Sequence, residues 1–211
     1  MLFNLMKKIL LLLFSLFFVN SPVVVAEEFT YEEEKMRNFE VLGMSIGDSL
    51  LDFMPEVDIF YEIEKHKKLN RYSSLKEPNK FLEITVPKQE DYLYDRAIVF
   101  IKNTIPSDYT IYGLRGYRYY IEDFDACIKR RNQIAEILTD FFPDAKTGSK
   151  VVEDNKSITD TFSIGYKAKN RLIDVSCLDI EETYRLKNNF REGLTFVIRN
   201  KEFSDWALDY K

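Results

Sequence analysis

The 211-residue chain is poor in the residue types on which most enzyme active sites depend. It has one histidine, two cysteines, seven glycines and six prolines. The histidine, His66, has a lysine on each side, and we interpret it as a solvated side chain rather than a general base. If the single histidine is solvated, the usual nucleophile–histidine pairs are not available to this chain, and a histidine-rich metal site would need further histidines.

Most sequence motifs for catalysis and cofactor binding are missing as well. The sequence contains no His-Glu-x-x-His, no Gly-x-Gly-x-x-Gly and no Gly-Lys-Ser/Thr, motifs that supply zinc ligands and phosphate-binding loops. Residues 43–47 match Gly-x-Ser-x-Gly, but Ser45 and Asp48 have the spacing of a capping box, and we interpret Ser45 as a helix cap rather than a nucleophile. No Cys-x-x-Cys is present for zinc binding or thiol exchange. We therefore expect no catalytic residues, no cofactor and no metal ion, and we favour a non-enzymatic role over an enzymatic one.

Carboxylates are the one catalytic residue type that is plentiful. Asp123 and Asp125 flank Phe124 at the start of a predicted helix, and Glu181 and Glu182 follow a predicted strand. A glycosidase needs two opposed carboxylates about 5–10 Å apart, a separation that sequence spacing does not determine. We interpret the first pair as helix caps and the second as surface residues. A carboxylate-dependent hydrolase of the cell envelope is kept as an alternative function.

The chain opens with a segment typical of a secretory signal peptide. Lys7 and Lys8 precede a long apolar run, and Val24-Val25-Ala26 provides small residues for cleavage before Glu27. We predict that residues 1–26 are removed and that the mature protein is periplasmic or secreted. The alternative is an uncleaved membrane anchor, because a run extended to residue 26 approaches the length of a membrane-spanning helix.

Charge and length limit the partners of the mature chain. Removal of residues 1–26 leaves 28 basic against 35 acidic side chains, and an acidic chain is unsuited to nonspecific binding of nucleic acid. We predict no nucleic-acid partner, and contact with a membrane only if the signal is retained.

The remaining length suits one domain with a substantial core. We expect a flexible acidic leader over residues 27–42 and a single domain over residues 43–211.

The two cysteines, Cys127 and Cys177, indicate a disulfide if the protein is exported. Cys127 falls on the apolar stripe of a helix predicted over residues 124–142. Cys177 alternates in step with Ile173 and Val175, so it falls on the apolar face of a predicted strand. We predict that one disulfide joins the long helix to the sheet. The alternative is a pair of buried free thiols.

Hydrophobic periodicity predicts the remaining elements. The expected helices cover residues 45–55, 58–68, 124–142 and 203–210; the expected strands cover 81–86, 95–102, 109–120, 161–166, 172–177 and 192–199, with a loop over 144–159. This pattern is typical of an α+β domain. We predict a mainly antiparallel sheet of five or six strands, with one long helix and shorter helices packed on one face.

One stretch, residues 117–120, is a possible binding surface. In a strand, Tyr117 and Tyr119 share one face, and Arg118 and Tyr120 share the other. Aromatic rings beside an arginine suit a protein partner, a cell-wall sugar or a hydrophobic ligand, although tyrosines also pack with their rings inward. We expect an exported, non-enzymatic binding or accessory protein that contacts an envelope protein or a cell-wall component. The alternatives are the hydrolase and an N-terminally membrane-tethered domain.

Overall fold

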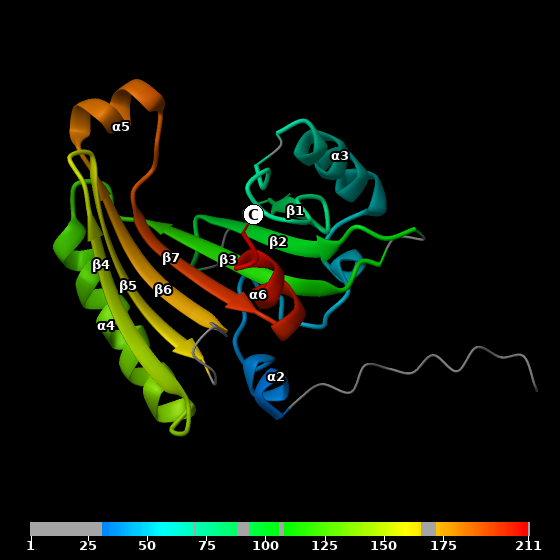
Figure 1. The fold of residues 1–211 in the computed structure, drawn as a ribbon, viewed down its shortest axis with the longest axis horizontal. Coiled ribbons are helices and arrows are strands. Elements are labelled where there is room, and N and C mark those ends of the chain that lie inside the picture. The colour runs from blue at the N-terminus through cyan, green and yellow to red at the C-terminus, as the bar shows by residue number, and fades with distance from the viewer. Residues whose placement is uncertain (1–30, 70, 88–92, 106–107, 166–171, 211) are drawn as a thin grey trace, which may run out of the picture. The chain divides into compact units, whose positions relative to one another are not determined.

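The computed structural model describes residues 31–69, 71–87, 93–105, 108–165 and 172–210. They belong to one unit, Tyr31–Lys211, and include a seven-stranded sheet and five helices (Figure 1). The strands are β1 (Phe81–Val86), β2 (Arg96–Lys102), β3 (Ile111–Tyr119), β4 (Lys146–Glu153), β5 (Ser157–Gly165), β6 (Ile173–Ile180) and β7 (Gly193–Arg199). The helices are α2 (Tyr31–Met36), α3 (Glu56–Lys67), α4 (Phe124–Phe141), α5 (Glu182–Asn188) and α6 (Lys201–Ala207), with one 3₁₀ turn, η1 (Leu50–Asp52).

The sheet is antiparallel throughout, in the order β1-β2-β3-β7-β6-β5-β4. Strands β1 to β3 form one meander, and strands β4 to β7 form a second. The two meanders join where β3 pairs with β7 at the middle of the sheet. Helix α4 connects the central strand β3 to the far edge strand β4 (Figure 1). The predicted α+β class is confirmed, with one strand more than the upper number expected.

The additional strand is β4, where the sequence predicts a loop over residues 144–159. That prediction is wrong because all eight residues of β4 are exposed, so the segment shows no alternation of apolar and polar side chains. Its backbone nevertheless pairs with β5 along its whole length. Asp154 closes the hairpin, since its carboxylate accepts the N–H groups of Lys156 at 2.7 Å and Ser157 at 2.8 Å.

Helices cover both faces of the sheet, which corrects the prediction of helices on one face. Val99 and Phe100 are consecutive residues of β2, so their side chains lie on opposite faces of the sheet. Val99 belongs to a large core and Phe100 to a smaller one. The large core lies against α4, and we call this side the α4 face. The smaller core contains Phe203 and Trp206 of α6, and we call this side the α6 face. Helix α6 packs there against β3 and β7.

A disulfide joins α4 to β6, as the sequence predicts. The Cα atoms of Cys127 and Cys177 are 5.9 Å apart, and both residues are fully buried. Asp123 caps the helix by accepting the N–H of Ala126 at 3.1 Å. Structural disulfides form in oxidising compartments, so the bond indicates that the chain folds outside a reducing cytoplasm. In the ranges described, no helix is long and apolar enough to span a bilayer.

The helix predicted over residues 45–55 is not formed, apart from η1. The capping-box contact is present, because the N–H of Ser45 donates to Asp48 at 2.8 Å. Gly47, however, has φ of 88°, a left-handed conformation that ends a helix. The backbone of residues 47 and 48 instead bonds to Ile111, with N–O distances of 2.9 Å in both directions. The segment therefore extends the sheet contacts at the start of β3.

The segment from residue 31 onward belongs to the domain rather than to a loose leader. Met36, Val41 and Leu42 are buried in the large core. The expectation of a flexible leader over residues 27–42 is therefore corrected for this part. Residues 1–30, including the predicted cleavage site, lie outside the described residues.

Helix α3 covers the edge of β1 and buries the single histidine. Nδ1 of His66 accepts the N–H of Glu83, and a carboxylate oxygen of Glu62 accepts the N–H of Thr85, both at 3.3 Å. These two N–H groups belong to an edge strand, so their capping blocks that edge against further pairing. His66 is 7% exposed, and the interpretation of a solvated histidine is wrong.

Candidate functional site

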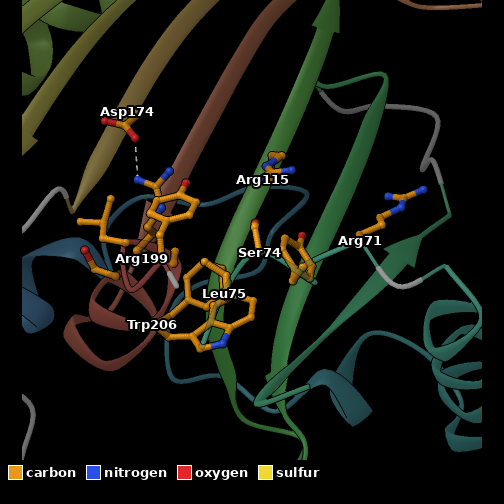
Figure 2. Close-up of a pocket in the computed structure, with 13 residues that line it drawn as sticks. Arg71, Ser74, Leu75, Arg115, Asp174, Arg199 and Trp206 are labelled. Carbon is orange, nitrogen blue, oxygen red and sulfur yellow. Dashed lines mark hydrogen bonds and ion pairs between the residues drawn. The ribbon is translucent and has the colours of Figure 1, made fainter. Parts of the chain in front are cut away.

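A cavity of about 410 Å³ lies on the α6 face of the sheet (Figure 2). The sheet contributes Arg115 from β3, Asp174 from β6 and Arg199 from β7. The remaining lining residues are Arg71, Tyr72, Ser74 and Leu75 from the segment before β1, and Phe203, Ser204, Trp206, Ala207, Leu208 and Tyr210 from α6 and the residues after it. We call this site the arginine cavity.

The register of the central strands brings the charged residues together. Arg115 and Asp174 both oppose Val197 of β7, one from each side. Arg199 lies two residues beyond Val197, so it shares the same face. Arg115 and Arg199 are therefore diagonal neighbours on adjacent strands, with backbones about 7–8 Å apart. Their guanidinium groups make different contacts, since that of Arg115 lies near Phe100 of β2 and that of Arg199 pairs with Asp174 of β6.

A glycine allows α6 to approach the floor of the cavity. Gly113 opposes Arg199 in the register, and a Cβ atom added there would lie 2.6 Å from the ring of Phe203. Asn200 caps α6, because its side chain accepts the N–H of Phe203 at 2.8 Å. The bare backbone of β3 and the helix cap together set the position of the α6 wall.

Asp174 holds Arg199 in place. Its Oδ2 lies 2.7 Å from Nη1 of Arg199, as the dashed line in Figure 2 shows. Asp174 is 8% exposed, and its Oδ1 has no hydrogen-bond partner among the described residues. A buried unsatisfied oxygen is destabilising by about 1–3 kcal/mol. The carboxylate of Asp174 thus makes a single contact, the ion pair that orients the guanidinium of Arg199 in the cavity floor.

Arg115 differs from the other arginines of the cavity because no described carboxylate forms an ion pair with it. Its Nη1 donates to the hydroxyl of Tyr117 at 3.3 Å, and its guanidinium lies 5.3 Å from the ring centre of Phe100. Burial lowers the pKa of Arg115. Electrostatic attraction to Tyr117, Tyr72 and Glu83 outweighs burial, so the pKa lies above its usual value. The side chain is a permanent cation without a carboxylate partner.

The charge of Arg71 is balanced by a buried carboxylate. Nη1 of Arg71 and the hydroxyl of Tyr72 reach the two oxygens of Glu83, at 2.5 and 2.8 Å respectively. Burial, together with Glu83, raises the pKa of Tyr72 well above its usual value, so its hydroxyl stays protonated and donates. The ring of Tyr72 stacks on His66 with a centroid separation of 5.9 Å. The histidine therefore supports one wall of the cavity from behind.

The four residues predicted as a binding surface lie beside the cavity and do not line it. Tyr117 and Tyr119 lie at strand positions of β3 that share the α6 face with Arg115, and the hydroxyl of Tyr117 accepts a hydrogen bond from Arg115. Arg118 is exposed and donates to the carbonyl of Leu93 at 3.2 Å. Tyr120 packs against the large core.

Sequence reasoning missed Arg115 itself. The signal was present, because Arg115 precedes Tyr117 by two residues and therefore shares its face of the strand.

The acidic pairs considered for catalysis lie elsewhere. Asp123 caps α4, as predicted, and Asp125 lies in its first turn. Glu181 caps α5, a helix the sequence did not predict, by accepting the N–H groups of Thr183 and Tyr184 at 2.9 and 2.7 Å. Among the described residues, no group of three metal-ligating side chains is present.

Comparison with known proteins gives no match: no family model, no curated protein and no solved structure is similar to the chain.

Proposed function

We propose that the chain is an exported, non-enzymatic binding protein whose ligand is an anion held in the arginine cavity. The observation that carries this proposal is Arg115, a cation in a concave site without a carboxylate partner among the described residues. The other two arginines have partners, since Arg71 pairs with Glu83 and Arg199 with Asp174. One positive charge of the cavity is thus unbalanced, and a bound anion would balance it.

Binding has more support than hydrolysis. A carboxylate-dependent hydrolase needs two opposed carboxylates, and Asp174 is the sole carboxylate among the described lining residues. The carboxylate of Asp174 is already engaged in an ion pair with Arg199. The cavity thus has the cationic groups for binding an anion but not the acid–base pair for cleaving a glycosidic bond.

The disulfide supports a periplasmic or secreted location, together with the apolar N-terminal segment. In that location the anion would come from the cell envelope or the surroundings of the cell. The net negative charge of the chain disfavours nonspecific attraction of anions. Selection of the ligand would therefore depend on the cavity itself.

The proposal is tested by titrating the purified protein with carboxylates, inorganic phosphate and sulfate in a calorimeter. We expect binding of at least one of these anions, and an at least tenfold loss for Arg115→Gln, because a hydrogen bond to a charged group contributes about 1.5–3 kcal/mol. Arg118→Gln is the matched control, since Arg118 is three positions further along the same strand and does not line the cavity. Unchanged affinity in Arg115→Gln, or no anion binding at all, would overturn the proposal.

A further inference from the structure

The arginine cavity has an apolar rim as well as a cationic floor. Leu208 and Tyr210 both line the cavity, yet they are 41% and 61% exposed. A hydrocarbon group bound in the cavity would remove these two side chains from water, which is favourable. An inorganic anion bound at Arg115 would leave this rim in water.

The rim is held in place by backbone contacts, so it is a preformed part of the site. Leu75 and Tyr210 form an isolated β-bridge. The N–H of Lys76 donates to the carbonyl of Asp209 at 3.1 Å, and Nε1 of Trp206 donates to the carbonyl of Glu77 at 2.7 Å. The segment before β1 and the chain after α6 therefore form one continuous wall. Binding against such a wall requires little ordering of the protein.

The size of the cavity fits an organic anion. Sites for organic ligands typically have volumes of about 300–1,000 Å³, and the arginine cavity falls in this range. Arg115 has no carboxylate partner among the described residues, and guanidinium groups bind carboxylates and phosphates through paired hydrogen bonds. The same cavity extends to Leu208 and Tyr210 of the rim, so it also offers space for a hydrocarbon group.

We propose that the ligand is an amphiphilic oxyanion, whose carboxylate or phosphate lies at Arg115 and whose hydrocarbon group lies against Leu208 and Tyr210. This inference rests on the anion site proposed above and adds the apolar half of the ligand.

A series of straight-chain carboxylates, from acetate to octanoate, tests the proposal by calorimetry, with hexyl phosphate, hexan-1-ol and hexylamine alongside. We expect affinity to rise about fourfold for each added methylene group that enters the cavity. Hexanol and hexylamine should bind at least tenfold more weakly than hexanoate, because neither carries an anion. Hexyl phosphate distinguishes the two possible head groups, since the tighter of hexanoate and hexyl phosphate identifies the preferred oxyanion.

Two variants separate the halves of the ligand. Arg115→Gln should weaken every member of the series by the same factor, whereas Leu208→Ser should reduce the gain per methylene and leave acetate unchanged. Leu186→Ser is the control, because Leu186 is exposed on α5 and does not line the cavity.

Three results would contradict the inference in different ways. Carboxylate affinity that is independent of chain length overturns the amphiphilic ligand and leaves the anion site standing. Failure of every anion to bind overturns both proposals. Hexanol that binds as tightly as hexanoate overturns the role of Arg115.

Discussion

Four of the charged residues on the α6 face line the arginine cavity or pair with a residue that lines it. Glu83, Arg115, Asp174 and Arg199 come from four different strands. A charge in a partly buried position is stable when it is paired, and three of the four form ion pairs with described residues. The exception, Arg115, is therefore the residue whose environment a ligand would complete.

At His66 we predict a loss of stability at mildly acidic pH. Burial lowers the pKa of His66, although the Glu83 carboxylate opposes this effect. The unfolded chain, whose histidine pKa is about 6.5, then binds a proton before the folded protein does. The contribution of His66 to the free energy of unfolding should be fully present above about pH 6.5. It should decrease as the pH falls toward the lower pKa that His66 has in the folded protein.

Urea denaturation of untagged protein at pH 7.5 and 5.5 measures this effect. His66 is the single histidine of the chain, so His66→Gln should remove the part of the pH dependence that histidine causes. The carboxylates near it, Glu62 and Glu83, are present in both proteins and cancel in the comparison. An identical pH dependence in the two proteins would show that His66 titrates normally.

At Gly113 we predict that a single methyl group displaces α6. In Gly113→Ala the new Cβ would lie 2.6 Å from the Phe203 ring, and such overpacking is destabilising by about 1–3 kcal/mol. Gly148→Ala is the matched control, because a Cβ atom at Gly148 meets nothing within 4 Å. Equal denaturation midpoints for the two variants would contradict the prediction.

At the scale of elements, α4 and α6 have separate tasks on opposite faces of the sheet. Helix α4 covers the large core and carries Cys127, whereas α6 forms a wall of the cavity. The ion pair between Arg131 and Asp160, with an N–O distance of 3.0 Å, adds a second link between α4 and the sheet. Stability of the α4 face and ligand binding on the α6 face should therefore be separable by mutation.

Removal of the disulfide tests this separation. The double variant Cys127→Ala, Cys177→Ala should be less stable by about 2–5 kcal/mol, the usual loss for a native disulfide. Its affinity for the anion should equal that of the wild-type protein at temperatures where it is folded, because neither cysteine lines the cavity. Chemical denaturation and calorimetry measure the two quantities. Stability equal to the wild type, or loss of binding by the folded variant, would contradict the prediction.

At the scale of the whole molecule, the cavity depends on the pairing of the two meanders. Arg115 comes from the first meander, and Asp174 and Arg199 come from the second. The β3–β7 ladder sets their register. A change that shifts this ladder by one residue would move one set of charges to the opposite face, so the site and the sheet form together.

Processing of the N-terminus is also a property of the whole molecule. We predict that the exported protein begins at Glu27, because Val24-Val25-Ala26 offers small residues for a signal peptidase. Sequencing of the N-terminus after export measures this directly. Recovery of the intact first 26 residues in a membrane fraction would instead support the membrane-tethered alternative.

The sequence by itself determined the features that depend on local periodicity. The strand-forming residues of β1, the continuous apolar run of β2, the alternation of β7 and the apolar stripe of α4 predict those elements closely. Cys127 and Cys177 each fall on an apolar face of their element. Because the chain has only these two cysteines, the two local patterns were sufficient to predict their bond. Local side-chain order was sufficient here because each pattern repeats within one element.

Only the tertiary structure decided what lies next to what. Strand β4 has no buried residue, so its pairing with β5, rather than its own sequence, makes it a strand. The cavity depends on long-range register, which places Arg115 beside Arg199 but leaves it without a carboxylate partner among the described residues. A pattern along the chain specifies the face on which a charge lies, whereas its neutralisation depends on side chains from distant strands and therefore on the folded sheet.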